Sequence, residues 1–186
     1  MTSKIRSIND LENCLENFGF RGEALASIRE ITRILKFASK PTSSKVTFEK
    51  VFLEGRPGAV TCASKERPSS GTTVTLLDFL HNVPVRRKKI SEMNDTEDIK
   101  VQLECLALIH PHMSISFKNV ATGKMILESR KCGSVKDVFG QLFGPVLSDH
   151  LKELTFDIGK GVQVHGYVST RGHYTKSYQL IYVNRR

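Results

Sequence analysis

The sequence predicts an α+β fold in two parts. Three stretches carry apolar residues at helical spacing, and they lie among short runs rich in β-branched and aromatic residues. Clusters of Gly, Pro and Ser separate these runs, as is typical of the turns between antiparallel strands. The pattern begins again near Cys132 and Gly133. We therefore expect one domain over residues 1–130 and a second over 131–186.

The first part is expected to form a helix followed by a sheet. Leu25, Ile28 and Ile31 recur at helical spacing, which predicts a helix from residue 23 to about 31. Four β-rich runs follow, at 31–39, 45–55, 58–64 and 71–79. The stretches KPTSS, GRPG and ERPSSG between them have the composition of turns. These runs predict a meander of antiparallel strands.

The remaining elements follow in the same way. A helix is predicted over residues 95–109, with Ile99, Leu103 and Leu106 on one face and a stop at Pro111. Strands are predicted at 114–120 and 124–129. Another helix begins at a capping serine, Ser134, and ends at residues 144–145. The last strands are expected at 154–170, around a Gly-Lys-Gly turn, and at 178–186.

Composition excludes several classes of protein. With 39% hydrophobic and 25% charged residues, the 186-residue chain is typical of a soluble globular protein. It has no run of about 20 apolar residues and no signal-peptide core, so an intracellular protein without a membrane span is expected. The four cysteines lack metal-ligand spacing, which favours a reduced, metal-free protein. The net charge of +9 suits a polyanionic partner, although simple solubility explains it equally well.

The stretch GFRGEAL, at residues 19–25, has two interpretations. Glycines permit close backbone approach, and a helix start exposes unpaired N–H groups with a partial positive charge. Glycine followed by a helix is therefore a recurrent phosphate cradle. The other interpretation is a tight turn before a helix with a favourable acid, Glu23, in its first turn. The pattern alone favours the turn.

Five stretches together resemble one protein family. TSKI at 2–5, DL at 10–11, GFRGEALASI at 19–28, GTTV at 71–74 and VPVRRK at 83–88 occur in the order seen in the MutL family. These are DNA mismatch-repair ATPases of the gyrase, Hsp90, histidine-kinase and MutL superfamily. The stretches GTTVT, PVRRK and HYTKSYQLIYVNRR most resemble the third eukaryotic MutL homologue, which is associated with meiotic crossing-over.

The resemblance implies a fold and a nucleotide site. Residues 1–130 would be the C-terminal half of a Bergerat (GHKL-type) ATP-binding α/β sandwich, and 131–186 the first part of a ribosomal-S5-like transducer domain. The resemblance implies that the Thr-Ser-Lys and GFRGEAL stretches form a lid over bound ATP. It also implies that a strand threonine, Thr72, contacts the adenine. The implied ATP-binding residues are Thr2, Ser3, Lys4, Gly19, Phe20, Arg21, Gly22, Glu23, Ala24, Leu25 and Thr72.

Basic residues are candidates for contact with DNA. No acidic residue follows Asp157, whereas five Lys or Arg do, and in MutL proteins the second domain faces duplex DNA. Such contacts would be made to the DNA backbone. A solvated surface remains the alternative, above all for the run RRKK. The candidates are Arg86, Arg87, Lys88, Lys160, Arg171, Lys176 and Arg185. His110 and His112 look like a ligand pair, but a helix end is the favoured interpretation.

Several family motifs do not occur in this sequence. The helix with the catalytic Glu and magnesium-binding Asn, and the Asp-x-Gly-x-Gly motif, would precede the Thr-Ser-Lys stretch. We therefore expect an internal fragment that contains no catalytic residue, is marginally stable and inactive alone, and binds ATP weakly if at all. ATP and Mg²⁺ are the expected cofactors of the full-length parent.

The function implied by the resemblance is that of a MutL-type ATPase. The parent would be a nuclear protein that forms an ATP-dependent clamp on DNA in mismatch repair, meiotic crossover resolution or both. The implied partners are another MutL homologue, a MutS-type recognition complex and duplex DNA. The alternative is a basic DNA-binding or scaffold remnant of the same fold that has lost ATPase activity.

Overall fold

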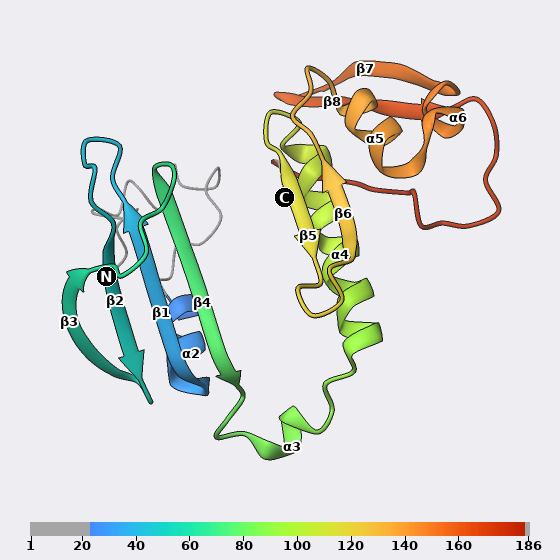
Figure 1. The fold of residues 1–186 in the computed structure, drawn as a ribbon. Helices are drawn as coiled ribbons and strands as arrows, with labels where there is room; N and C mark the ends of the chain where they lie inside the picture. The colour runs from blue at the N-terminus through green and yellow to red at the C-terminus, as the bar shows by residue number, and fades with distance from the viewer. Residues whose placement is uncertain (1–22, 185–186) are drawn as a thin grey trace. The chain divides into compact units, whose positions relative to one another are not determined.

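The computed structural model describes residues 23–184, which form two compact units (Figure 1). One unit extends to Ile90 and the other begins at Ser91. The mixture of helices and sheets confirms the predicted α+β class. The boundary predicted between residues 130 and 131 falls inside the second unit, and as an assignment of family domains it stays a prediction.

The first unit is a four-stranded antiparallel sheet with a helix packed against β1. The helix α2 runs directly into β1, as the local pattern predicted. Leu35 of β1 lies opposite Phe52 on one side and Leu76 on the other, and only 1% of it is exposed. The elements are α2 Glu23–Ile31, β1 Thr32–Lys40, β2 Phe48–Leu53, β3 Arg56–Cys62 and β4 Gly71–Phe79.

The sheet is not the simple meander that the sequence predicted. Its strand order is β3-β2-β1-β4, so β4 pairs with β1 instead of β3. Residues 63–70 carry the chain from one edge of the sheet to the other, across roughly 15 Å of strand spacings. Eight residues can span about 26 Å when extended, so the connection is long enough. Pairing with the nine-residue β1 gives β4 hydrogen bonds along nearly its full length.

The second unit begins with the long helix α4, Glu92–Ile109. It starts three residues before the predicted position because the Ser91 side chain caps it. Its buried residues are Ala107 and Leu108. Of the predicted apolar face, Leu103 and Leu106 are half-buried and Ile99 is 47% exposed, so only the C-terminal part of that face is covered. The predicted strands pair as the hairpin β5 (Ile115–Lys118) and β6 (Met125–Ser129). A short helix, α3 (Pro84–Arg87), precedes this unit in the chain.

The helix α5, Val135–Phe143, carries the core residue of this unit. Val138 is fully buried and packs against Ala107 and Leu108 of α4. The predicted cap is confirmed, since the Ser134 hydroxyl accepts a hydrogen bond from the Asp137 N–H at 3.1 Å. The short helix α6 (Pro145–Ser148) follows. The hairpin of β7 (Leu151–Gly159) and β8 (Val162–Ser169) completes the unit, with its turn at the predicted Gly-Lys-Gly sequence.

The strand predicted at 178–186 is wrong for the residues that the structure describes. Residues 178–184 contain no strand. Leu180 packs against the core cluster, and the Tyr182 hydroxyl donates a hydrogen bond to the Cys105 carbonyl at 3.0 Å. Burial is the main cause that raises the pKa of Tyr182, and the Cys105 side chain raises it further. Side-chain anchoring to α4 therefore fixes this apolar segment without strand pairing.

We predict that Gly144→Ala destabilises the chain by about 1–3 kcal/mol, because Gly144 has φ 94° and ψ 152°, a region open essentially to glycine alone. No atom would lie within 4 Å of the added Cβ, so the cost comes from the backbone. Gly133→Ala is the matched control, since its Cβ also meets no atom and its φ lies outside the left-handed region. Urea unfolding of both variants measures the difference, and equal stabilities would contradict this account.

Candidate nucleotide site

The start of α2 belongs to the predicted phosphate cradle. Glu23, Ala24 and Leu25 form the first turn of the helix, and all three are exposed, Leu25 by 54%. The first N–H groups of a helix lack intrahelical partners and attract anions. The other predicted cradle and lid residues lie outside the described residues. They are Thr2, Ser3, Lys4, Gly19, Phe20, Arg21 and Gly22.

Thr72 lies near the beginning of β4, opposite Ser39 of β1. Their hydroxyl oxygens are 2.9 Å apart and share a hydrogen bond. Each hydroxyl keeps further donor or acceptor capacity, and the pair is exposed. Ser39 was not among the predicted site residues, because nothing in the sequence indicates that β1 is the neighbour of β4. Together the two hydroxyls can bind a polar group or a water molecule on this face of the sheet.

Apolar side chains lie next to the Ser39–Thr72 pair on the same face. Residues two apart in a strand share a face, which places Phe37 and Val74 next to the pair. Phe48 of β2, the other neighbour of β1, pairs with Ser39 and is 41% exposed. A flat apolar surface with a few hydroxyls can accept an aromatic ring and orient it by hydrogen bonds.

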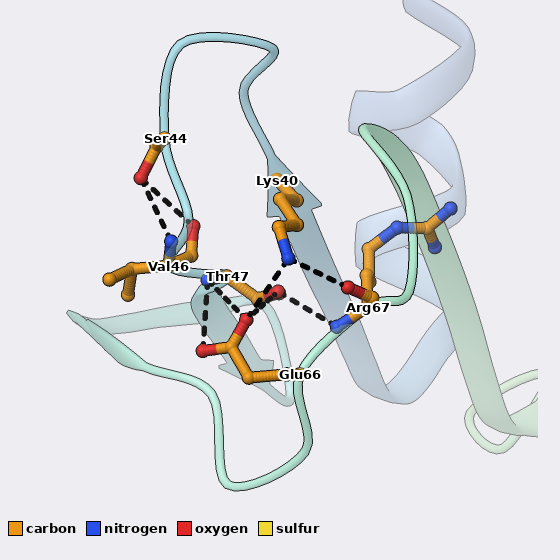
Figure 2. A network of polar contacts seen from close by, with 6 residues as sticks. All are labelled: Lys40, Ser44, Val46, Thr47, Glu66 and Arg67. Carbon is orange, nitrogen blue, oxygen red and sulfur yellow. Dashed lines mark hydrogen bonds and ion pairs between the residues drawn. The ribbon is translucent and has the colours of Figure 1, made fainter.

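A network of polar contacts holds the connection between β3 and β4 (Figure 2). The Glu66 carboxylate accepts hydrogen bonds from the Thr47 N–H, at 3.1 and 3.3 Å, and from the Thr47 hydroxyl, at 2.9 Å. The same hydroxyl accepts from the Arg67 N–H at 2.9 Å. The Lys40 ammonium donates to the Arg67 carbonyl at 2.9 Å and lies 3.7 Å from the Glu66 carboxylate. We call these four residues the Glu66 network.

The Glu66 network favours the charged carboxylate. The hydrogen bonds from the Thr47 side chain and backbone lower the pKa of Glu66 below its ordinary value of 4.5, and Lys40 lowers it further. Desolvation acts in the opposite direction but is outweighed. The carboxylate therefore accepts these bonds at neutral pH without losing charge.

The basic residues 86–88 lie at the short helix α3. Arg86 and Arg87 form its last turn and Lys88 follows as its C-cap, and all three are exposed. The guanidinium of Arg87 lies 3.8 Å from the Asp78 carboxylate, which also faces Arg33 at 3.6 Å. An anion would compete with Asp78 for Arg87.

The predicted DNA contacts of the second unit do not meet in one cluster. Lys160 lies in the β7–β8 turn, whereas Arg171 follows the far end of β8. Eight strand residues separate these ends by roughly 27 Å. Lys176 is exposed in the segment after β8, and Arg185 lies outside the described residues. Lys160 and Arg171 could contact phosphates only at separate points along a polyanion.

Comparisons with known proteins identify the relatives of this chain. No protein-family model matches the sequence. Human DNA mismatch repair protein Mlh3 is 37% identical over 185 residues, which cover all of this chain and 13% of that protein. The MutL protein of Desulforudis audaxviator is 31% identical over 188 residues, with all of this chain and 32% of that protein covered.

Solved structures share the fold of this chain. The crystal structure of the N-terminal domain of a DNA repair protein matches with a TM-score of 0.72 and 26% identity, covering 99% of this chain and 58% of that one. The Aquifex aeolicus MutL ATPase domain complexed with ADP matches with a TM-score of 0.66 and 22% identity, covering 90% of this chain and 62% of that one.

This chain is a MutL-family sequence along its whole length. The prediction from GFRGEAL and the accompanying motifs is confirmed, and so is the GHKL-type α/β fold of the family's ATPase domain. The likeness to human Mlh3 agrees with the predicted subfamily. The chain spans 13% of Mlh3 and about a third of the D. audaxviator MutL protein.

Residues 23–184 of this MutL-family chain also contain histidines and cysteines away from the candidate nucleotide site. His110 caps α4, and its ring lies perpendicular to that of His112, with centroids 5.7 Å apart. Within this range, no group of three or more His, Cys, Asp or Glu residues could hold a metal ion. Cys62, Cys105 and Cys132 have free thiols. None of the described helices is long and apolar enough to cross a membrane.

The depressed pKa of Glu66 predicts a pH-dependent contribution to stability. A carboxylate with a lowered folded-state pKa stabilises the fold above the ordinary value of 4.5, and this contribution is lost as pH falls through the folded-state pKa. We expect Glu66→Gln to lower the urea midpoint at pH 7, and the difference from wild type to shrink as the pH falls below 4.5.

The matched control for this prediction is Glu54→Gln. Glu54 is an exposed carboxylate of the same unit and lies 3.8 Å from Arg33. We expect a smaller change from it at pH 7, because exposed ion pairs contribute little. A constant difference between Glu66→Gln and wild type at every pH would contradict the assignment.

Proposed function

We propose that this chain supplies part of the nucleotide site of a MutL-type ATPase that acts in DNA mismatch repair. The observation that carries the proposal is the exposed Ser39–Thr72 hydroxyl pair, in a MutL-family chain whose structural relatives include an ATPase domain with bound ADP. The pair has the chemistry to orient an adenine ring, directly or through water, above the apolar face next to it.

The described residues also fit a phosphate group at the start of α2. The N–H groups of the first turn, at Glu23 and the two residues after it, would be the donors to phosphate oxygens. Such an anion gains about 0.3–1 kcal/mol from the helix end. The Glu23 carboxylate would repel the phosphate, so its role is limited to its backbone N–H. The proposed cradle and lid also include Thr2, Ser3, Lys4, Gly19, Phe20, Arg21, Gly22, Ala24 and Leu25.

ATP would supply a hydrolysable phosphoanhydride when bound. We assign no residue of the described range to Mg²⁺ or to water activation, since this range has no cluster of metal-binding side chains. We propose that other residues of a longer parent perform both tasks and that this chain alone is inactive. Within the chain, residues 1–130 would contribute the sheet and lid, and 131–186 the start of an S5-like transducer domain.

The wider role follows from the family. We propose a nuclear protein that pairs with another MutL homologue, receives a signal from a MutS-type recognition complex and closes around duplex DNA when ATP binds. The resemblance of the sequence to the third eukaryotic MutL homologue supports a further role in meiotic crossover resolution, which we also propose. The DNA would then be held through contacts to its phosphate backbone, without its sequence being read. The proposed contact residues are Arg86, Arg87, Lys88, Lys160, Arg171, Lys176 and Arg185.

Nucleotide binding tests the proposed role of Thr72. In a human Mlh3 chimera that carries this chain in place of the matching segment, we expect Thr72→Val to weaken ATP binding about 2- to 12-fold, the effect of one lost hydrogen bond. Thr75→Val is the control, since Thr75 lies on the same strand but on the opposite face. Equilibrium titration with ATP and Mg²⁺ measures both affinities. Equal affinities in the two variants would contradict the proposed contact.

DNA binding tests the basic residues independently. The logarithm of the association constant should fall linearly with the logarithm of salt concentration, with a slope of about −0.9 per phosphate contacted. We expect Lys160→Gln and Arg171→Gln each to make this slope less steep by about one, for duplexes of any sequence. Lys65→Gln, a change at an exposed lysine outside the proposed contacts, is the control. A salt-independent affinity would exclude phosphate contacts.

The runner-up function is a DNA-binding or scaffold module without ATPase activity. The acid-free stretch after Asp157, with exposed Lys160, Arg171 and Lys176, favours it. The two experiments separate the alternatives. Salt-dependent DNA binding in a chimera that does not bind ATP would favour the scaffold, whereas ATP binding that depends on Thr72 would favour the ATPase.

A further inference from the structure

We propose that the Glu66 network positions Thr72 from the opposite face of the sheet. This inference rests on the proposed function, in which Thr72 contacts the nucleotide. The network itself does not touch that face. It would determine whether the Ser39–Thr72 pair is correctly placed when a nucleotide arrives.

The start of β4 needs support from outside the sheet. β4 is an edge strand, and β1 is its only partner in the described sheet. Its first residue, Gly71, has φ 136° and follows a connection with no regular structure. The end of an edge strand next to such a connection would fray unless other contacts held it.

The Glu66 network holds the connection at a buried point. Thr47 is fully buried, so its hydroxyl cannot replace lost partners with bulk water. That hydroxyl donates to the Glu66 carboxylate and accepts from the Arg67 N–H, so it hydrogen-bonds to two consecutive residues of the connection. Lys40, the last residue of β1, binds the Arg67 carbonyl. Both backbone polar groups of Arg67 are therefore fixed.

Arg67 transmits this constraint to β4. Its guanidinium hydrogen-bonds to the Thr73 hydroxyl, and its Nη2 would lie 3.1 Å from a Cβ added at Gly71. The side chain thus packs closely against the residues on both sides of Thr72. It lies on the same face of β4 as the Thr73 side chain, because its guanidinium contacts the hydroxyl of that side chain.

Thr72 and the Arg67 side chain lie on opposite faces of β4. Thr72 points away from Arg67, toward Ser39 and the apolar surface, since successive strand residues face opposite sides. Ser39 fixes Thr72 on one face while Arg67 fixes Thr73 on the other. Glu66 is the only carboxylate among the contacts of the network, and it faces the cation of Lys40. Glu66 and Arg67 are therefore positioning residues.

Two substitutions at Thr47 test the proposal in the 186-residue chain. Thr47→Val removes the hydroxyl but keeps the shape, whereas Thr47→Ser keeps the hydroxyl. We expect Thr47→Val to speed amide hydrogen exchange at residues 71–73 by roughly tenfold or more relative to residues 76–77 of the same strand, because two hydrogen bonds are lost and one alone accounts for up to about tenfold. Thr47→Ser should remain within about threefold of wild type. Glu66→Gln is a milder variant that serves the same purpose if Thr47→Val does not fold.

Nucleotide affinity in the Mlh3 chimera completes the test. We expect Thr47→Val to weaken ATP binding several-fold and Thr47→Ser to restore it. If exchange increases equally along all of β4, the network is merely structural and the proposal fails. The proposal also fails if exchange increases only at residues 71–73 and Thr72→Val weakens ATP binding, but Thr47→Val leaves ATP affinity unchanged. If Thr72→Val has no effect on ATP affinity, the proposed nucleotide contact fails, whatever the exchange shows.

Discussion

The first unit depends on the pairing of β1 with β2 along one side and with β4 along the other. Its nine residues lie between β2 and β4, and Leu35 at its centre is almost completely buried. The same register that buries Leu35 places Ser39 beside Thr72 and Lys40 beside Gly71. The candidate site is thus a consequence of how the core is formed. A shift of one residue between β1 and β4 would turn Thr72 to the other face.

Local elements could be predicted from the sequence, and their partners could not. The helix at α2 and the strand at β4 follow from short-range spacing and from glycines at their ends, so their bounds agree with the prediction. The pairing of β4 with β1 depends on contacts between residues more than 30 positions apart. Ser39 was missed for this reason. The segment around Tyr182 alternates like a strand, but its side chains are anchored on α4 instead.

The two kinds of candidate contact differ in what holds them. Thr72 is held within a hydrogen-bonded sheet, and the adjoining connection is tied to a fully buried threonine. Lys160 lies in a turn between two glycines, with φ 54°, and Arg171 follows the end of a strand. A base is bound by short, directional bonds, whereas phosphates attract cations over several ångströms. The rigid and the loosely held positions suit these different requirements.

The two edges of the four-stranded sheet differ in their capacity to grow. At β3, Pro57 removes a backbone donor, and the pairing with β2 is irregular between Lys50 and Phe52. Both features discourage the addition of another strand. β4 presents nine residues without proline. Extension of this sheet is therefore directional: a new strand would join alongside β4, next to Thr72, and would build outward from the candidate site.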